Sequence, residues 1–495
     1  FEGNVATTDN DSGVAGGALS LVGEAGAGVS TISGSVFRSN QARNYGGAIF
    51  QSSGDRFEVE DTLFEDNQVF AAANEYGGGA SAEAHGGAVT VDRSTEVIIQ
   101  RSEFLNNSAT NYGGALYVGR SGRGGTVEIA DSTFEGNQAK ISSLEGTLAL
   151  GGGIYADGPT GDAVDFSLIR STLSGNSAEG AGGALYASGA DLTVTIASST
   201  LDGNSSASGG GAVHLRGVGG SSLAIEHSTI TGNQVTGTAV SDAAALYADG
   251  PGAIDITHTV IAGNTQGGAG AGNICVGESS VQPGLVYSFW DNSFNADGCN
   301  QPLADASNIL DETDPGLTDL ADNGGYTLTR YPTEGSPLIN AGNPNIMAEP
   351  DTDQRGSCRV VGGVIDIGAV EFGNHGAVAE TLDDQTLSVG QSLILDASQV
   401  FSDPEGDALS YELIGAPLGI TIDSTSGVIS GEPSVAGEFP IEVIATDPCG
   451  ASASATMSVT VKAAASSDSS GGGGGSMGYF IALLASLVWW RRLRR

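Results

Sequence analysis

Apolar and polar residues alternate in short runs along the first 300 residues of the chain. Clear examples are Phe57/Val59, Val127/Ile129, Leu223/Ile225 and Ile254/Ile256. Alternation with a period of two places one face of a β-strand inward. No run has helical spacing, so we expect strands that pair with the preceding and following repeats.

A short phrase recurs between these runs: an apolar residue, two variable positions and an asparagine. It occurs at Phe1–Asn4, Phe37–Asn40, Phe64–Asn67, Phe104–Asn107, Phe134–Asn137, Leu173–Asn176, Leu201–Asn204, Ile230–Asn233 and Ile261–Asn264. The asparagines are 27 to 40 residues apart, a period typical of solenoids. Because Asn tolerates the left-handed conformation and its amide can bond the next repeat, we predict one structural column of asparagines. A column of ligand contacts is the alternative.

Most repeats also contain two glycines followed by a branched residue. These phrases are Gly46–Ile49, Gly86–Val89, Gly113–Leu116, Gly152–Ile154, Gly182–Leu185 and Gly210–Val213. Glycine takes positive φ without steric cost, which suits a sharp corner. One repeat cannot bury its own apolar face, so stability must come from stacking. The pattern therefore predicts an all-β coil of stacked strands, three to a turn.

Composition narrows the class of protein. Glycine accounts for 78 of 495 residues without a period of three, which excludes collagen. Acidic residues outnumber basic ones by 58 to 18, giving a net charge of −40. Nucleic acid is therefore excluded as a partner, and divalent cations or basic surfaces are the natural counterparts. The chain begins within a repeat, so we expect it to be truncated at its N-terminus, with an export signal upstream.

Two cysteines stand where the repeats end. Cys275 and Cys299 close a short loop, and we predict a disulfide between them, which implies an oxidising compartment. No Cys-x-x-Cys or histidine cluster offers a zinc site. Whether Cys358 and Cys449 pair stays open.

A series of phrases follows the repeats. They are Asp314–Leu317, Leu320–Thr329, Gly335–Gly342, Thr352–Gly356 and Asp366–Glu371. In these phrases the chain resembles the choice-of-anchor (type Q) bacterial surface proteins, and its repeats are similar to polymorphic outer-membrane-protein repeats. The resemblance implies a right-handed parallel β-helix in residues 1–300 and a cap region in residues 301–375. It implies no catalytic residues.

Residues 376–462 change to short strands at regular spacing, which predicts a β-sandwich. This module resembles the cadherin-like and immunoglobulin-like modules of bacterial surface proteins, in which carboxylates hold calcium. The resemblance implies a calcium site at Asp403, Glu405, Asp407 and Asp447, and oxygen ligands suit Ca²⁺. A plain turn is the alternative.

The chain ends in a Gly/Ser linker, residues 463–476, and an apolar segment with an arginine tail, residues 477–495. This order resembles the GlyGly-CTERM sorting signal of Gram-negative bacteria. The resemblance implies a transmembrane sorting helix that contacts the membrane until a rhombosortase-like intramembrane protease removes it. Cleavage is expected near Gly474, Gly475 and Ser476. The mature protein would then lie at the cell surface or outer membrane, or outside the cell.

A β-helix also supports carbohydrate-active enzymes, so a polysaccharide lyase or glycoside hydrolase is the alternative function. Such enzymes need clustered carboxylates. Candidate aspartates such as Asp131 and Asp202 occupy unlike positions in their repeats, so the sequence predicts no cluster. His227 and His258 end alternating strands and are expected to face solvent.

One column of aromatic residues follows the apolar residue of the glycine phrase. Its members are Phe50, Tyr117, Tyr155, Tyr186 and Tyr247, with His214 in the same place. If the apolar residue points inward, these side chains point outward and form a stripe. Such a stripe could bind a polysaccharide or a protein on a host or neighbouring cell. Packing that only stiffens the sheet is the alternative. The sequence thus predicts a non-enzymatic surface protein for adhesion or display.

Overall fold

A computed structural model describes the chain from residue 1 to residue 463, with gaps. The gaps are residues 7–13, 24–27, 71–83, 120–123, 142–147, 159–161, 219, 238–242, 251, 268–273, 277–283, 292–304, 311–313, 346–351, 362–363, 374–376, 404–407, 449 and 451.

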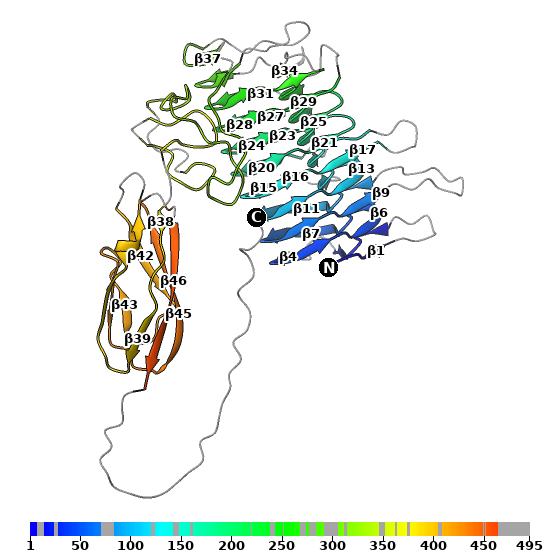
Figure 1. Cartoon of the computed structure of the whole chain (residues 1–495). Coiled ribbons are helices and arrows are strands. Elements are labelled where there is room, and N and C mark those ends of the chain that lie inside the picture. The colour runs from blue at the N-terminus through cyan, green and yellow to red at the C-terminus, as the bar shows by residue number, and fades with distance from the viewer. Residues whose placement is uncertain are drawn as a thin grey trace, which may run out of the picture.

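Three parallel sheets wind around a common core in the first part of the chain (Figure 1). The sixteen-stranded sheet contains β3 (Leu19–Val22), β4 (Val29–Ser33), β7 (Ile49–Glu60), β11 (Val89–Gln100), β14 (Leu116–Gly119), β15 (Gly125–Ala130), β18 (Ile154–Asp157), β19 (Val164–Ile169), β22 (Leu185–Ala190), β23 (Leu192–Ala197), β26 (Val213–Val218), β27 (Ser222–Glu226), β30 (Leu246–Asp249), β31 (Ala253–Thr257), β34 (Ile274–Val276) and β35 (Gly284–Val286). The ten-stranded sheet contains β5 (Val36–Arg38), β8 (Leu63–Glu65), β12 (Glu103–Leu105), β16 (Thr133–Glu135), β20 (Thr172–Ser174), β24 (Thr200–Asp202), β28 (Thr229–Thr231), β32 (Val260–Ala262), β36 (Phe289–Trp290) and β37 (Ile309–Leu310). The eleven-stranded sheet contains β1 (Val5–Ala6), β2 (Val14–Ala15), β6 (Gln41–Tyr45), β9 (Gln68–Phe70), β10 (Ala84–His85), β13 (Ser108–Tyr112), β17 (Gln138–Lys140), β21 (Ser177–Ala178), β25 (Ser205–Ser206), β29 (Gln234–Val235) and β33 (Thr265–Gln266).

Each turn of this coil contributes strands to all three sheets, and every strand pair in the coil is parallel. In one typical turn, β12 leads to β13 and then to β14 and β15. β12 pairs with β8 before it and β16 after it, so that Phe104 lies between Phe64 and Phe134. The predicted stacking of repeats into a parallel coil is therefore confirmed.

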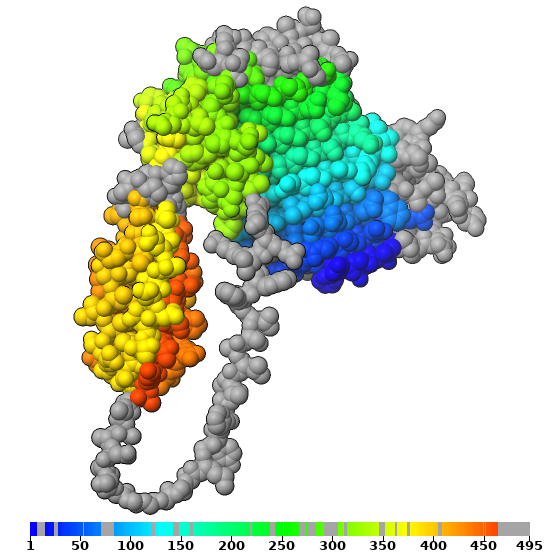
Figure 2. All heavy atoms as spheres, viewed as in Figure 1, coloured from blue at the N-terminus to red at the C-terminus, as the bar shows by residue number. Residues whose placement is uncertain are grey.

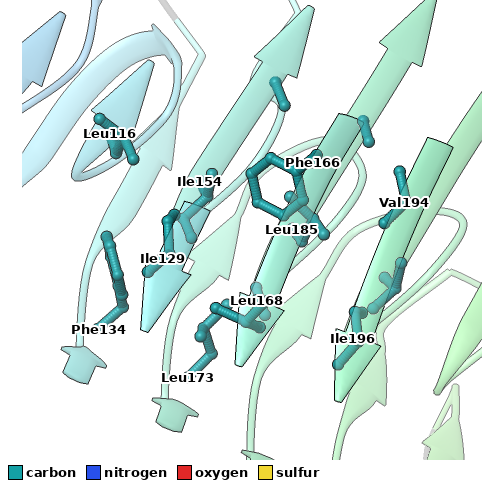
Figure 3. Packing of buried hydrophobic residues seen from close by; sticks show 14 of the residues in the cluster. Leu116, Ile129, Phe134, Ile154, Phe166, Leu168, Leu173, Leu185, Val194 and Ile196 are labelled. Carbon is teal, nitrogen blue, oxygen red and sulfur yellow. The ribbon is translucent and has the colours of Figure 1, made fainter. Parts of the chain in front are cut away.

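The core consists of the inward side chains of the alternating strands (Figure 3). The aromatic residues of the asparagine phrase form one stack within it: the rings of Phe64 and Phe104 are 4.7 Å apart, and those of Phe104 and Phe134 are 4.4 Å apart. Leu173 continues this column. Full burial of one such side chain contributes about 1.5–3 kcal/mol, so the coil gains stability turn by turn.

The asparagines form the predicted single column, which we call the Asn ladder. Its buried members are Asn40, Asn67, Asn107, Asn137, Asn176, Asn204, Asn233 and Asn264. Asn137 shows the repeating pattern: its Nδ2 donates to Oδ1 of Asn176 (2.9 Å) and to the main-chain oxygen of Phe104 (2.8 Å). Its Oδ1 accepts from the main-chain nitrogen of Asn107 at 2.9 Å. Each buried amide thus satisfies polar groups of two neighbouring turns.

A second polar column, the Ser/Thr ladder, stands five residues before the asparagines of the Asn ladder and continues for one more turn to Ser288. It comprises Thr62, Ser102, Ser132, Ser171, Ser199, Ser228, Thr259 and Ser288. Each hydroxyl accepts from the main-chain nitrogen of the previous member, as Ser171 does from Ser132 at 3.2 Å, and donates to the carbonyl oxygen two residues before it, as in Ser171 to Ile169. The two ladders therefore bracket each strand of the ten-stranded sheet.

Glycine pairs make the corners that precede the sixteen-stranded sheet, as predicted. Gly46 has φ of 57°, and a Cβ atom there would overlap the main-chain oxygen of Ile49. The next residue, Gly47, lies against the main-chain oxygen of Gly87 in the following turn. Both the left-handed backbone and the close approach of turns require glycine.

The described residues between 305 and 373 contain little regular structure and fold back along the coil. Figure 2 shows them, in yellow-green, covering one flank of the coil. Hydrogen bonds join them to β20, β24 and β28 of the ten-stranded sheet. We call residues 305–373 the clamp. The cap region expected after the repeats thus lies beside them along a flank.

The last described region is the predicted β-sandwich. Its strands are β38 (Val378–Ala379), β39 (Gln385–Ser388), β40 (Leu393–Asp396), β41 (Phe401–Ser402), β42 (Ser410–Ile414), β43 (Ile420–Ile422), β44 (Val428–Gly431), β45 (Gly437–Thr446) and β46 (Ser452–Lys462), with a 3₁₀ turn at Ala397–Val400. A four-stranded sheet, β39-β46-β45-β42, and a three-stranded sheet, β40-β44-β43, enclose one apolar cluster that includes Ile429 and Val443.

No helix among the described residues has the length and apolar character needed to cross a membrane. The predicted sorting helix at residues 477–495 and the predicted cleavage residues Gly474, Gly475 and Ser476 lie outside the described residues.

Candidate functional site

The predicted aromatic stripe is present on the sixteen-stranded sheet. The register places Ser20, Phe50, Thr90, Tyr117, Tyr155, Tyr186, His214 and Tyr247 in one column. We call the aromatic members from Phe50 to Tyr247 the aromatic ladder. Most of these side chains are half-buried, whereas Tyr186 is 5% exposed.

The rings of the aromatic ladder stack on one another. The rings of Tyr117 and Tyr155 are 5.3 Å apart and 6° from parallel, and those of Tyr155 and Tyr186 are 5.3 Å apart and 4° from parallel. The ring of His214 follows at 4.6 Å from Tyr186. Because neighbouring rings cover each other's faces, ring edges and phenol hydroxyls are the parts of the ladder that are not covered by other rings of the column.

Thr90 interrupts the aromatic residues of this column, and a histidine from the eleven-stranded sheet, His85, supplies a ring at that turn. The Thr90 hydroxyl donates to the main-chain oxygen of His85. The ring of His85 then stacks on Tyr117 at 4.2 Å and meets Tyr45 edge-on. The aromatic surface is therefore continuous across a turn that lacks an aromatic residue in the column.

A column of polar residues stands two positions further along the same face. Its polar members are Ser52, Asp92, Asp157, Ser188, Arg216 and Asp249, and Gly119 stands in the same register between Asp92 and Asp157. We call it the polar column. Ser188 donates to Asp157 at 3.1 Å. Burial raises the pKa of Asp157, and burial together with the nearby Asp157 raises the pKa of Tyr155. The two columns thus place phenols next to carboxylates along one face.

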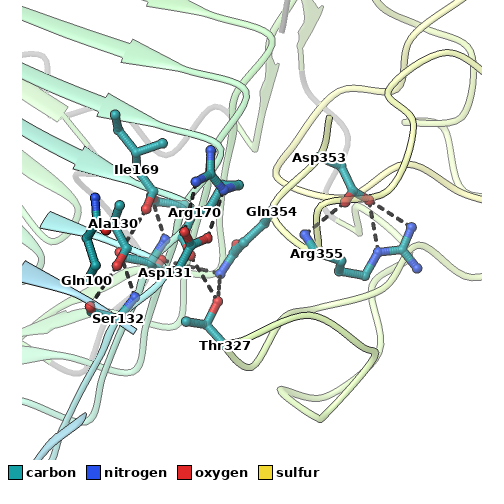
Figure 4. A network of polar contacts seen from close by, with 12 residues as sticks. Gln100, Ala130, Asp131, Ser132, Ile169, Arg170, Thr327, Asp353, Gln354 and Arg355 are labelled. Atoms are coloured by element: carbon teal, nitrogen blue, oxygen red, sulfur yellow. Dashed lines mark hydrogen bonds and ion pairs between the residues drawn. The ribbon is translucent and has the colours of Figure 1, made fainter. Parts of the chain in front are cut away.

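The clamp attaches to the coil through a glutamine. Nε2 of Gln354 donates to the hydroxyls of Thr172 (2.8 Å) and Thr327 (2.9 Å), and its Oε1 accepts from Thr200 at 2.6 Å. Thr327 in turn donates to the main-chain oxygen of Arg170 at 3.1 Å (Figure 4). Gln354 and its partners are buried, so these bonds are shielded from water.

An ion pair and an apolar cluster complete the attachment. Arg330 of the clamp donates through Nε to Asp202 of β24 at 2.6 Å. Leu338 and Ile367 of the clamp pack with Val260 and Phe289 of the ten-stranded sheet. Sequence reasoning missed this docking, because the contacting residues are far apart in the chain, by 128 positions for Arg330 and Asp202 and by 182 for Gln354 and Thr172.

Three carboxylates and two arginines meet inside the clamp. The carboxylates are Asp353, Asp366 and Glu371, and the arginines are Arg355 and Arg359. Each carboxylate is at most 1% exposed. Their oxygens accept main-chain N–H groups of the clamp: Asp353 from Ser357, Asp366 from Phe372, and Glu371 from Val361.

This cluster lies inside the clamp and not in a groove. Burial and the charge of Asp366 raise the pKa of Glu371 to about 8. The main-chain nitrogen of Glu371 donates to Asp353, and that of Asp366 donates to Glu371. These hydrogen bonds join the phrases Thr352–Gly356 and Asp366–Glu371 in a segment that lacks regular strands. The cluster therefore stabilises the fold of the clamp.

The predicted catalytic alternatives are not brought together in the described part of the coil. Asp131 pairs with Arg170 at 2.8 Å on one corner, and Asp202 pairs with Arg330 under the clamp. The expectation that His227 and His258 face solvent is wrong. They are 5% and 3% exposed, because the clamp covers the corner on which they stand.

The predicted calcium ligands are only partly described. Asp447 is buried at 4% exposure, and Asp403 lies at the end of β41, whereas Glu405 and Asp407 lie outside the described residues. No group of three or more metal-ligating side chains occurs among the residues that the structure describes. The calcium site stays a prediction.

The cysteines are likewise described in part. Cys275 and Cys358 each take part in a disulfide. Cys299 and Cys449 lie outside the described residues, so the pairing of Cys275 with Cys299 stays a prediction.

Comparisons with known proteins agree with the class of protein that this fold defines. Residues 376–462 match the family model "Putative Ig domain". Residues 101–119 and 170–188 match the Chlamydia polymorphic membrane protein repeat. Together with the stacked parallel sheets, these matches fit a surface protein built on a β-helix.

Other comparisons give little more. No curated protein matches the chain significantly. Among solved structures, an endo-fucoidan hydrolase of glycoside hydrolase family 107 is 27% identical over 19% of this chain and 15% of its own, with a TM-score of 0.16. A nucleoside hydrolase-related protein from Saccharophagus degradans is 23% identical over 19% of this chain and 28% of its own, with a TM-score of 0.17. A PKD domain is 22% identical over 20% of this chain and 92% of its own, with a TM-score of 0.15.

The chain thus spans less than a third of the length of the two hydrolase-related proteins. At these TM-scores the similarities carry no argument about function.

Proposed function

We propose that this chain is an exported, non-enzymatic cell-surface protein that binds a partner through the aromatic ladder and the polar column. The supporting observation is the register of the ladder, which continues over successive turns while most of its side chains stay half-exposed. Tyrosine and arginine are the residue types that contribute most at protein interfaces. A regular face of this kind suits adhesion or display.

The ring geometry favours a protein partner over a polysaccharide. Sugars dock on the faces of aromatic rings, but the faces of Tyr155 are covered by Tyr117 and Tyr186. Ring edges and hydroxyls remain available, and these can contact apolar and polar groups of a protein. Because the chain has a net charge of −40, the fitting partner has a basic surface.

Cell binding of ladder variants tests this proposal. In the double variant Tyr117→Thr/Tyr155→Thr, threonine replaces tyrosine in a column that already holds Thr90. Loss of two central aromatic contacts should weaken binding to host or neighbouring cells by roughly 30-fold or more. The control Tyr326→Ser removes an aromatic side chain that is 69% exposed on the clamp and should bind normally.

Treatment of the target cells separates the two kinds of partner. Protease treatment should abolish binding of the wild-type chain, whereas periodate should leave it intact. Loss with periodate alone would identify a polysaccharide as the partner. Equal binding by the ladder variant and the wild type would exclude this face as the site.

We further propose that the chain is sorted and anchored as its resemblances imply. On this proposal, a rhombosortase-like protease cleaves near Ser476, calcium binds the immunoglobulin-like module, and Cys275 pairs with Cys299. Support comes from the order of glycines, apolar residues and arginines at residues 470–495, and from the disulfide state of Cys275.

A further inference from the structure

Two parts of the clamp meet the coil at one histidine. The main-chain oxygen of His258 accepts a hydrogen bond from the nitrogen of Gly368 at 2.8 Å. Its ring Nε2 accepts from the main-chain nitrogen of Asn343 at 3.1 Å. The His258 side chain is 3% exposed, so both contacts are sealed from water by the clamp.

This geometry requires the neutral form of His258. Because Nε2 accepts from a main-chain N–H, it carries no proton, and the single ring proton must be on Nδ1. Nδ1 is buried and has no hydrogen-bond partner among the described residues. A second proton would point from Nε2 towards the N–H of Asn343, remove that bond and place an unpaired charge in a dry site.

Rings from both neighbouring turns pack against His258. The ring of His227, which is 5% exposed, stacks on it at 4.5 Å and 6° from parallel. The ring of Tyr287 stacks at 5.4 Å and 2°. The ring neighbours of His258 are therefore a second histidine and a tyrosine, neither of which is an anion that would stabilise an imidazolium.

The clamp places a positive charge against the same site. Arg359 is 1% exposed, and its Nη2 donates to the main-chain oxygen of Gly368, the residue that contacts His258. Burial, followed by the charge of Arg359, lowers the pKa of His258 to about 4 and that of His227 to about 2. The other charged groups of the clamp around Arg359 are Asp353, Arg355, Asp366 and Glu371.

We propose that the clamp is an acid-sensitive cover, which lies on the ten-stranded sheet while His258 is neutral and loosens when His258 and His227 are protonated. Loosening would expose Thr172, Thr200 and Thr229, whose hydroxyls bond the clamp in the docked state. The clamp would thus hide a second polar face of the coil at neutral pH.

The sign of the pH effect follows from proton linkage. The pKa of His258 lies below its ordinary value of 6.5 while the clamp is docked. Its contribution to docking is therefore fully present above about pH 6.5 and is lost as the pH falls towards 4. For this single group, the docking equilibrium should weaken by about 70-fold between pH 7.5 and pH 4.5.

Hydrogen exchange of the whole chain tests the proposal. After correction for intrinsic rates, peptides from residues 314–345 should exchange much faster at pH 4.5 than at pH 7.5, whereas coil peptides from residues 127–140 should keep their protection. Unchanged protection of the clamp at both pH values would overturn the proposal.

Two histidine variants supply the matched comparison. His258→Gln offers an uncharged acceptor to Asn343, so the acid response of the clamp should shrink at least tenfold. His214→Gln removes the histidine of the aromatic ladder, whose pKa burial also lowers to about 4, and it should leave the clamp's acid response unchanged. Equal acid responses in both variants would contradict the assignment to His258.

An NMR pH titration of His258 in the wild-type chain tests the proposal even if a variant folds poorly. With ¹³C-labelled histidine, the His258 signal should titrate well below 6.5 and together with the loss of clamp protection. Titration near 6.5 with the clamp still protected would refute the inference.

Discussion

At the scale of single residues, the coil depends on buried amides that serve two turns at once. Asn137 donates to Asn176 and Phe104 and accepts from Asn107, and all four of these residues are fully buried. A buried polar group that loses its partner costs about 1–3 kcal/mol. Loss of one asparagine therefore removes its own hydrogen bonds and also leaves buried polar groups of both neighbouring turns without partners.

The variant Asn137→Ala should lower the free energy of unfolding by about 2–5 kcal/mol, because it leaves buried groups of both neighbouring turns without partners. Denaturant unfolding measures this. The adjacent exposed side chain provides the control, since Gln138→Ala should change stability by less than about 0.5 kcal/mol. Similar values for the two variants would mean that the Asn ladder is dispensable.

Some of these residue roles could be predicted from the sequence and others could not. The asparagines were predictable because one residue type recurs at the same distance from an apolar residue. The Ser/Thr ladder is equally regular. However, serine and threonine also occur throughout the loops, so Ser132 and Ser171 could not be distinguished from other hydroxyl residues in the sequence. The burial of His227 and His258 depends on a segment about 100 residues away, which periodicity cannot reveal.

At the scale of elements, the clamp and the ten-stranded sheet are matched in side-chain size. In one column of this sheet, the first strands hold Arg38, Glu65, Leu105 and Glu135, which are half-buried or exposed, and the following strands hold Ser174, Asp202, Thr231 and Ala262, which are buried. The change from large to small side chains follows the edge of the clamp. This is the signal in the sequence that could have located the docking face.

The attachment of the clamp can be tested at Gln354. Gln354→Leu keeps the side-chain size but leaves Thr172, Thr200 and Thr327 without their bonds to its amide. The clamp should become at least tenfold more sensitive to limited proteolysis at neutral pH, while the coil keeps its melting temperature.

An exposed residue of the clamp gives the comparison. Asn345→Ala lies on the clamp surface and should be cleaved at the wild-type rate. If Gln354→Leu is cleaved no faster than Asn345→Ala, the buried amide does not hold the clamp.

Calcium binding by the sandwich module can be tested at Asp403 and Asp447. If Asp403 and Asp447 are ligands, Ca²⁺ should raise the melting temperature of the module in the whole chain and release heat on titration. The double variant Asp403→Asn/Asp447→Asn should show neither effect. Absence of heat with the wild-type chain would leave these residues as turn formers.

At the scale of the whole molecule, the chain combines an acidic coil, a clamp and an immunoglobulin-like module. The repeats and the module were predictable because local patterns define them, and residues 376–462 match the family model "Putative Ig domain". The aromatic column was also predictable, whereas the angles between neighbouring rings were not, since the tilt of each ring depends on its neighbours.

The sorting proposal makes a prediction about the mature protein. Cells that contain the intramembrane protease should release a chain that ends near Ser476, because a glycine-rich entry to a helix lowers the cost of unwinding it. Mass spectrometry of the C-terminus, with and without the protease, measures this. An end at Arg494-Arg495 in both strains would indicate a permanent anchor.

Footprinting of the tyrosines on bound cells tests the binding face most directly. Oxidative labelling should be reduced at Tyr117, Tyr155 and Tyr247 when the chain is bound to its target cells, and it should stay unchanged at Tyr326 on the clamp. Reduced labelling at Tyr326 with the ladder still labelled would place the binding face elsewhere and contradict the account.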